Sequence, residues 1–182
     1  MLELTIFILG SLGLIYISRQ ALTIPYSHGF PRFFAFEATL GLVVLNAEKW
    51  FNQPFSLPQI ISWALLLNAL ALAIHSIWAL RTYGALDSTI QDPNRLAFEK
   101  TTRLVIQGPY QFIRHPMYAS LLCLAWGVFL KQITLLSGLL AFLVSLTLFL
   151  TSVYEERENL SFFGLAYVNY MQHTKRFIPF IF

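Results

Sequence analysis

The chain has 182 residues, of which 57% are hydrophobic and 12% are charged, and its formal net charge is +3. Soluble domains carry about 25% charged residues, so a soluble globule of this size would lack the charged groups that cover its surface. A soluble enzyme, a disordered chain and a nucleic-acid-binding protein are therefore disfavoured. The composition indicates a single integral-membrane domain over residues 1–182. The lone Cys123 excludes an internal disulfide and a multi-cysteine metal site.

Five apolar segments approach the length of about 20 residues that a helix needs to cross a membrane. They are Leu2–Ser18, Phe33–Trp50, Leu57–Leu80, Met117–Leu130 and Thr134–Tyr154. We interpret the first as a retained helix, because no basic segment precedes it and no small-residue cleavage site follows. Lys131 and Gln132 leave room only for a tight turn, so the last two spans are expected to form a helical hairpin. The sequence thus predicts an all-α polytopic bundle with about five transmembrane helices.

The two halves of the chain differ in character. Residues 1–80 hold three of the predicted spans, whereas residues 81–182 hold a long polar connection with Asp92-Pro93-Asn94, the hairpin and a tail. In the tail, Phe163, Tyr167 and Tyr170 recur on one face of a helix, which is expected to lie at the membrane interface. The six residues from Phe177 to Phe182 are predicted to anchor the tail at that interface.

The distribution of Lys and Arg predicts an orientation. With the N-terminus outside, ten of these residues lie on the inner side and only Lys49 and Lys131 on the outer side. Short inner loops of membrane proteins are enriched in Lys and Arg. We therefore expect the N-terminus to lie outside and the two polar inner segments, with any active site, to face the cytoplasm.

Two polar clusters could carry chemistry, since the chain has no GxxxxGK[ST] loop, no GxGxxG after a strand and no HExxH, CxxC or GxSxG motif. One is Gly108-Pro109-Tyr110 with Arg114-His115-Pro116-Met117-Tyr118, just before the fourth span. The other is Glu155-Glu156, just after the fifth. A hairpin places both clusters at one membrane surface, where a water-soluble cofactor can meet a lipid-soluble substrate. Taken separately, Gly-Pro is also typical of a simple turn, and the two glutamates are also typical of a solvated helix end.

A carboxylate inside a predicted span is a further candidate. Glu37 interrupts the second span, and charged groups at membrane depth are costly and often functional. Glu37 and the nearby Arg32 are therefore candidate substrate-binding residues, unless Glu37 simply pairs with Arg32 or Arg19 near the interface. His75 and Cys123 are interpreted as packing residues.

The two clusters resemble the signature of the isoprenylcysteine carboxyl methyltransferase and phospholipid methyltransferase superfamily. The first matching block is Leu104-Val105, Gly108, Tyr110, Arg114-His115-Pro116 and Tyr118; the second is Glu155-Glu156, Phe163-Gly164, Tyr167, Tyr170, Arg176 and Pro179. The resemblance covers residues 95–182. The N-terminal half, from His28 to Glu37, resembles a bacterial-type branch of the same superfamily.

This resemblance implies an integral-membrane methyltransferase that uses S-adenosylmethionine and a lipophilic acceptor, with no metal and no nucleic acid. The cofactor-binding residues that it implies are Thr102, Arg103, Leu104, Val105, Tyr110, His115, Pro116, Met117, Tyr118 and Glu155. The Glu155 carboxylate could accept from the cofactor's ammonium group, and tyrosine faces could attract its sulfonium. Glu156 is the candidate catalytic base.

One departure and two alternatives remain. In the carboxyl methyltransferases an Arg that binds the substrate carboxylate lies four residues before the first Glu of the pair, and here that position is Thr151. Carboxylate methylation is thus disfavoured. The Arg-His-Pro-x-Tyr turn also resembles membrane-bound NADPH-dependent sterol-type reductases, although the Glu-Glu pair favours methyl transfer. The second alternative is a membrane protein without enzymatic activity.

Overall fold

The structure, a computed structural model, describes residues 1–85, 87, 96 and 99–181. These residues form α-helices and short 3-10 turns without any strand, as the sequence predicts; Asp92-Pro93-Asn94 lies outside them. The helices are α1 (Leu2–Ser18), α2 (Gly29–Leu45), α3 (Leu57–Tyr83), α4 (Pro116–Phe129), α5 (Leu135–Phe163) and α6 (Leu165–His173). The short turns are η1 (Ala21–Thr23), η2 (Ala47–Lys49) and η4 (Gly108–Gln111).

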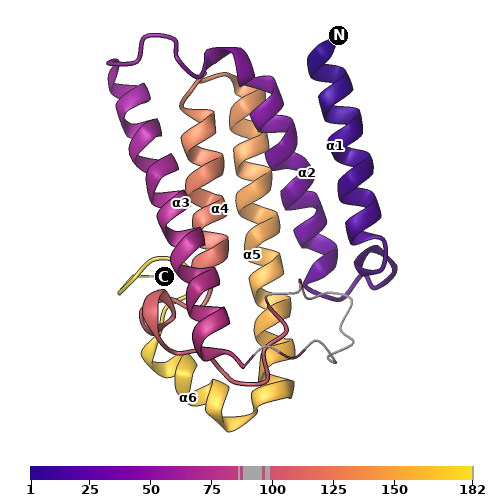
Figure 1. The fold of residues 1–182 in the computed structure, drawn as a ribbon, viewed down its shortest axis with the longest axis vertical. Helices are drawn as coiled ribbons and strands as arrows, with labels where there is room; N and C mark the ends of the chain where they lie inside the picture. Colours follow the sequence, from indigo (N-terminus) through magenta and orange to yellow (C-terminus); the bar gives the residue numbers. More distant parts are fainter. Residues whose placement is uncertain (86, 88–95, 97–98, 182) are drawn as a thin grey trace.

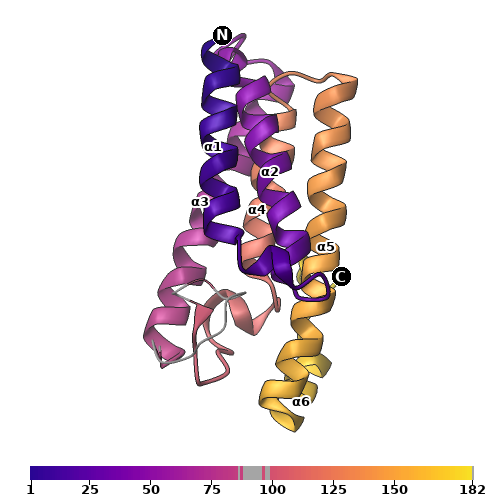
Figure 2. The ribbon, with the colours of Figure 1, turned by 90° about the vertical axis from the view of Figure 1, so that its right-hand side faces the viewer.

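Helices α1–α5 run side by side in the order α3, α4, α5, α2, α1 across the molecule (Figure 1). The closest packing joins α3 to α4 and α2 to α5. Helix α2 is the helix on which α1 chiefly packs. Helix α6 lies beyond the lower end of α5 (Figure 2). Residues 99–107 and the turn η4 lie at this same end, which therefore carries both polar clusters.

Two of the described helices are long and apolar enough to cross a membrane. Helices α3 and α5 have 27 and 29 residues and are apolar enough to cross a membrane, and α1 and α4 are shorter apolar helices of 17 and 14 residues. The predicted hairpin of the last two spans forms as α4 and α5. Helix α5 continues past the predicted end at Tyr154 to Phe163, so Glu155 and Glu156 lie on a helix that extends out of its apolar section.

Small side chains fill the interior where the helices meet. The buried residues of α3 include Ser62, Ala69 and Ala79, those of α4 include Ala125 and Gly127, and α5 buries Ala141 and Thr147. Ser62 Oγ donates to the Gly127 carbonyl at 2.7 Å, which joins α3 to α4. Small residues let helices approach closely inside a membrane, where large apolar groups gain little by leaving lipid. Leu, Ile and Phe side chains are accordingly exposed around the bundle, and α1 has no buried residue.

The tail differs from its prediction at two points. Gly164 has φ +57° and ψ −133°, a conformation that side chains strongly disfavour, so it ends α5 and starts α6 in a new direction. Phe163 thus lies on a different helix from Tyr167 and Tyr170, not on one continuous helix. Phe177 is buried in the main apolar core, and only the residues after it, such as Ile178 and Phe180, are exposed. The prediction that Phe177 belongs to an interfacial anchor is therefore wrong.

Candidate functional site

The two polar clusters meet at the lower end of the bundle. His115 is the N-cap residue of α4 and Pro116 occupies its first turn, where a missing N–H costs nothing. Just upstream, Gly108 has φ +63°, which favours glycine and lets η4 fold back over the start of α4. The Tyr170 hydroxyl of α6 donates to the Tyr110 carbonyl at 2.6 Å and so fixes η4 to the tail.

Glu156 is the centre of an ion-pair cluster that joins three segments. Its side chain is 5% exposed, and it accepts from Arg114 Nε at 2.8 Å, from Arg176 Nη2 at 2.5 Å and from Arg176 Nε at 3.2 Å. His115 Nε2 lies 3.3 Å from the same carboxylate. A buried carboxylate is tolerated when it is paired and hydrogen-bonded in this way. Glu156 therefore connects α5 to the segment before α4 and to the tail.

Backbone hydrogen bonds complete the attachment of the tail. Ile113 and Lys175 form a parallel bridge, in which Arg114 N donates to the Lys175 carbonyl at 2.8 Å and Lys175 N donates to the Phe112 carbonyl at 3.1 Å. His115 N donates to the Arg176 carbonyl at 3.1 Å. The chain from residue 112 to His115 is therefore held along its length by residues 175 and 176.

His115 links this ion-pair cluster to Glu155, which lines a pocket. His115 is 4% exposed, its ring stacks on Tyr118 with centroids 5.4 Å apart, and Nδ1 lies 3.6 Å from Glu155 Oε2. Burial lowers the pKa of His115, but the hydrogen bonds and negative charges of Glu155 and Glu156 raise it by more. The net effect is a raised pKa. A protonated imidazole can donate to both carboxylates at once. Glu155 is therefore held in place beside a positive charge.

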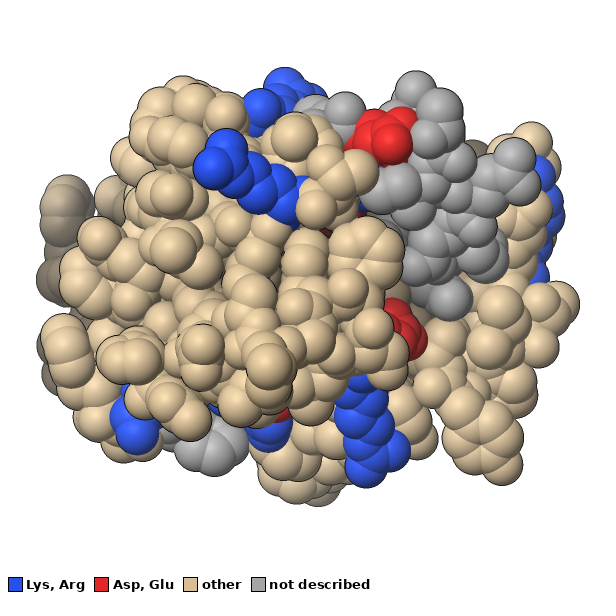
Figure 3. All heavy atoms as spheres, turned by 90° about the horizontal axis from the view of Figure 1, so that it is seen from below, with Lys and Arg blue, Asp and Glu red and all other residues tan. Residues whose placement is uncertain are grey.

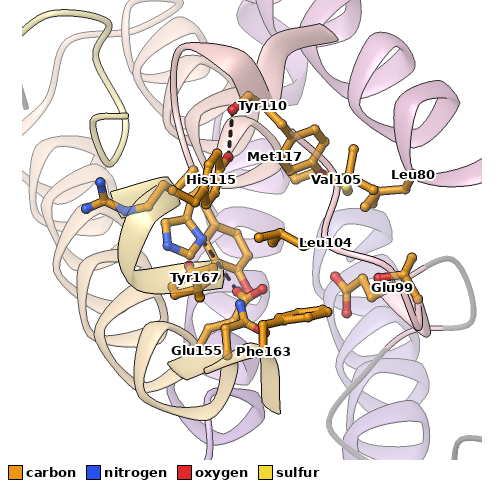
Figure 4. Close-up of a pocket in the computed structure, with 15 residues that line it drawn as sticks. Leu80, Glu99, Leu104, Val105, Tyr110, His115, Met117, Glu155, Phe163 and Tyr167 are labelled. Atoms are coloured by element: carbon orange, nitrogen blue, oxygen red, sulfur yellow. Dashed lines mark hydrogen bonds and ion pairs between the residues drawn. The ribbon is translucent and has the colours of Figure 1, made fainter. Parts of the chain in front are cut away.

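The pocket next to this pair is an open cleft whose empty space, including its mouth, is about 640 Å³. In Figure 4, His115, Glu155, Phe163 and Tyr167 gather on one side and Leu104, Val105, Leu80 and Glu99 on the other. The complete lining is Leu80, Glu99, Thr101, Leu104, Val105, Tyr110, Arg114, His115, Met117, Tyr118, Glu155, Asn159, Phe163, Tyr167 and Tyr170. It combines aromatic faces with two carboxylates.

The tyrosines of the pocket are neutral hydrogen-bonding groups. Burial, followed by the charge of Glu155, raises the pKa of both Tyr110 and Tyr167. Their hydroxyls therefore stay protonated, and their rings present apolar, electron-rich faces to a ligand.

Most of the residues predicted to bind a cofactor line this pocket. Those that do are Leu104, Val105, Tyr110, His115, Met117, Tyr118 and Glu155. Three do not: Thr102 and Arg103 are exposed with their backbones bonded to Ala85 and Gly84, and Pro116 is buried inside the start of α4. Glu156 also lies outside the lining, because its oxygens face the two arginines.

The two candidate substrate residues lie apart from each other. Arg32, which is 5% exposed, donates from Nη1 to Glu99 at 2.8 and 3.2 Å and so contacts a pocket residue from behind. Glu37 faces α1, where it accepts from Ser11 Oγ at 2.8 Å, and its buried Oε1 has no hydrogen-bond partner among the described residues. Glu37 does not line the pocket, so only Arg32 is close to it.

Eight lining residues were not among those predicted to bind the cofactor. Four of them, Arg114, Phe163, Tyr167 and Tyr170, belong to the two matching sequence blocks, whereas Leu80, Glu99, Thr101 and Asn159 had no functional prediction. No local pattern marks Glu99; its position depends on the Arg32 ion pair between segments far apart in the chain. The Thr101 side chain packs directly against the backbone of Gly84, where a Cβ would lie only 2.4 Å from it. Glycine at position 84 therefore makes room for Thr101. His28 was also missed: it is buried, its N–H donates to Glu158 at 2.9 Å, and its ring Nδ1 lies 2.5 Å from Glu158 Oε2.

A comparison with protein families decides which family the chain belongs to. The family model for phospholipid methyltransferases matches residues 58–175, more than half of the chain. The chain belongs to the phospholipid methyltransferase family. No curated protein and no solved structure matches it.

Family membership makes this protein a membrane methyltransferase and agrees with the superfamily resemblance of the two clusters. The matched residues of this phospholipid methyltransferase family member run from Pro58 in α3 to Lys175 in the tail and include η4, α4, α5 and α6. They therefore contain every residue of the pocket lining. Helices α1 and α2 lie outside the matched residues, yet α2 and the segment before it supply Arg32 and His28 behind the pocket.

The ion pairs of His115 and His28 predict a stability that depends on pH. Burial lowers the pKa of His28, but Glu158 and Glu155 raise it more, so both histidines have a raised pKa in the fold. Their contribution is complete below the ordinary value of about 6.5 and is lost as the pH rises through the raised folded values. We expect the thermal midpoint in detergent to fall over that window. In His115→Gln the fall should be shallower and the midpoint at pH 6 lower. Parallel pH profiles for parent and variant would contradict this.

Proposed function

We propose that this family member transfers a methyl group from S-adenosylmethionine to a lipophilic acceptor at the lower end of the bundle. The observation that carries the proposal is the Glu155 carboxylate, fixed by His115 at the wall of an aromatic pocket. The pocket opens where helices that are apolar along their length end in polar structure. The alternatives, a reductase and a protein without enzymatic activity, have no comparable support from the family match.

The residues of the pocket fit the charges of this cofactor. The Glu155 side chain is 27% exposed, so its carboxylate can accept from an ammonium group. The faces of Tyr110, Tyr118 and Tyr167 can surround a sulfonium cation, which aromatic rings attract. When bound, S-adenosylmethionine would supply an activated methyl group, which passes to a nucleophile as the neutral thioether leaves. The protein has then to align the acceptor and exclude water.

The structure supports a positioning role for Glu156 in place of the catalytic-base role that its sequence position suggested. Both of its carboxylate oxygens accept hydrogen bonds from arginines, and His115 also contacts one of them. These contacts stabilise the ionised carboxylate, which makes it a poor acceptor for a substrate proton. His115 itself, with its raised pKa, is a proton donor to the carboxylates. We propose that direct attack by an uncharged acceptor group needs neither residue as a base, because the methylated acceptor can lose its proton to solvent after the transfer.

Replacing Glu155 with Gln should weaken the binding of S-adenosylmethionine. A hydrogen bond to a charged group is worth about 1.5–3 kcal/mol, so the dissociation constant should rise roughly 10- to 150-fold. Isothermal titration of the purified protein in detergent measures this directly. Glu48→Gln, on an exposed residue in η2 at the opposite end, is the matched control and should bind as the parent does. Unchanged affinity in Glu155→Gln, or tight binding of NADPH but not S-adenosylmethionine, would refute the proposal.

The acceptor is proposed to be a lipid group other than a carboxylate held by arginine. Thr151, at the position of the carboxylate-binding Arg of the related enzymes, is fully buried and donates to the carbonyl of Thr147 in its own helix at 2.7 Å. The two arginines near the pocket are already ion-paired, Arg114 with Glu156 and Arg32 with Glu99. Neither offers a free bidentate fork for a substrate carboxylate.

Methyl transfer to membrane lipids tests this choice of acceptor. Membranes that contain the protein are given methyl-labelled cofactor, and the extracted lipid is treated with mild alkali. We expect the label to stay with the lipid, because N-methyl groups and ethers survive alkali whereas carboxyl methyl esters release methanol. Glu155→Gln is the background control, since it should transfer little label. Label recovered entirely as methanol would show ester formation and overturn the proposed acceptor class.

The charges of the structure also support an orientation with the pocket on the cytoplasmic side. Apart from Arg95, which lies outside the described residues, the basic residues other than Lys49 and Lys131 lie at or near the lower end, and several are visible from below in Figure 3. Lys49 and Lys131 lie together at the upper end, where Gln59 Nε2 donates to both of their carbonyls. This asymmetry follows the bias of inner loops towards Lys and Arg.

Cysteine labelling checks the orientation. In a Cys123→Ser background, Asn52→Cys and Gln172→Cys place single exposed thiols at the upper and lower ends. In intact cells an impermeant maleimide should label the first and reach the second only after permeabilisation. The reverse pattern would show that the pocket faces outward. Lys131 itself is a poor labelling position because it is 5% exposed.

A further inference from the structure

Lys131 is a buried cation without a carboxylate partner, at the end of the bundle opposite the pocket. It is 5% exposed and lies in the turn between α4 and α5. Nζ donates to Gln59 Oε1 at 3.0 Å and to the Trp50 carbonyl at 3.4 Å, and it lies 3.6 Å from the ring centroid of Trp63. Among the described residues no Asp or Glu forms an ion pair with it. Burial lowers the pKa of Lys131, as expected for an ammonium without a counter-charge.

A donor-rich depression lies directly beside this ammonium. Its lining contains two lysines and several side-chain amides but no carboxylate: Lys49, Asn52, Gln53, Ser56, Pro58, Gln59, Leu130, Lys131, Gln132 and Ile133. The 27-residue helix α3 begins here, and Ser56 at its N-cap makes no side-chain capping bond. The first N–H groups of a helix favour an anion. The charge, the donors and the helix end therefore all complement a negative group.

The surroundings of the depression indicate what the anion is attached to. Phe51, Phe55 and Ile133 are exposed around it, and Trp50 and Trp63 contact Lys131. Aromatic residues concentrate at the level of lipid headgroups. An anion at this height, between a polar depression and exposed apolar side chains, can keep acyl chains in hydrocarbon while its charge meets Lys131. A phospholipid can place its phosphodiester in the polar depression and its acyl chains against the exposed apolar side chains, whereas free phosphate can use only the polar depression.

We propose that the Lys49–Lys131 depression binds the phosphate of an anionic phospholipid in the leaflet opposite the methyl-transfer pocket. The lipid phosphate supplies the counter-charge that Lys131 lacks, and Gln59 orients the ammonium by accepting one of its three protons. The site is separate from the pocket by the length of the bundle, so it does not depend on the proposed methyl transfer.

The test is lipid retention by the full-length protein, measured by native mass spectrometry after exchange into mixed micelles of phosphatidylglycerol or phosphatidylcholine. The parent should retain phosphatidylglycerol preferentially. Lys131→Gln should weaken its binding about tenfold or more, the scale of one lost charge-assisted hydrogen bond. Arg19→Gln, which removes the same charge from an exposed residue at the lower end, should retain the lipid as the parent does.

Two further arms decide between the possible outcomes. Lys49→Gln leaves the interhelical bonds of Lys131 intact, so it tests the site even where Lys131→Gln does not fold, and it too should reduce retention. Inorganic phosphate should leave the thermal midpoint unchanged, whereas phosphatidylglycerol should raise it. A folded Lys131→Gln or Lys49→Gln that retains phosphatidylglycerol as the parent does would overturn the proposal. A midpoint that rises with inorganic phosphate but not with lipid would overturn the choice of a lipid.

Discussion

The buried carboxylate of Glu156 must be paired, and that requirement organises the lower end of the molecule. An isolated carboxylate out of water is so costly that it is found with partners, and here they come from two other segments, Arg114 before α4 and Arg176 in the tail. Because Glu155 is the preceding residue on α5, fixing Glu156 towards the arginines turns Glu155 towards the pocket. His115 contacts both glutamates and transmits the same constraint to the start of α4.

A membrane environment imposes a second constraint, which shapes the rest of the bundle. Large apolar side chains gain little from leaving lipid, so many Ala, Ser and Thr side chains are buried between the helices beside a few larger ones such as Leu42 and Leu148, and many Leu, Ile and Phe side chains are exposed. Close packing of α3 on α4 and of α2 on α5 then fixes where the helices end. The pocket lies at these ends, where α3 and α5 extend beyond the apolar section and bring polar groups together. Stability and function are thus placed in different parts of the same helices.

The N-terminal helices take part in the site although they lie outside the residues that match the family. Arg32 pairs with Glu99, and the segment before α2 places His28 against Glu158 on α5. Both contacts lie behind the pocket and hold its walls from outside. Helix α1 contributes only its packing on α2, with Ser11 and Glu37 as a polar contact in the middle of the pair. Variation in the N-terminal half could therefore alter the pocket without changing any residue that lines it.

The sequence by itself determined the all-helical membrane class, the approximate positions of the five bundle helices and the meeting of the two polar clusters, because hydropathy is a local property of the chain. It also identified the family, since the Arg114–Tyr118 and Glu155–Glu156 blocks are contiguous in sequence. Only the tertiary structure decided that Glu99, Thr101 and Asn159 line the pocket, that Thr102 and Arg103 do not, and that Glu156 faces arginines rather than a ligand. These outcomes depend on contacts between distant segments, such as Arg32 with Glu99 and Arg176 with Glu156, and the energy that selects them exists only once the helices have packed.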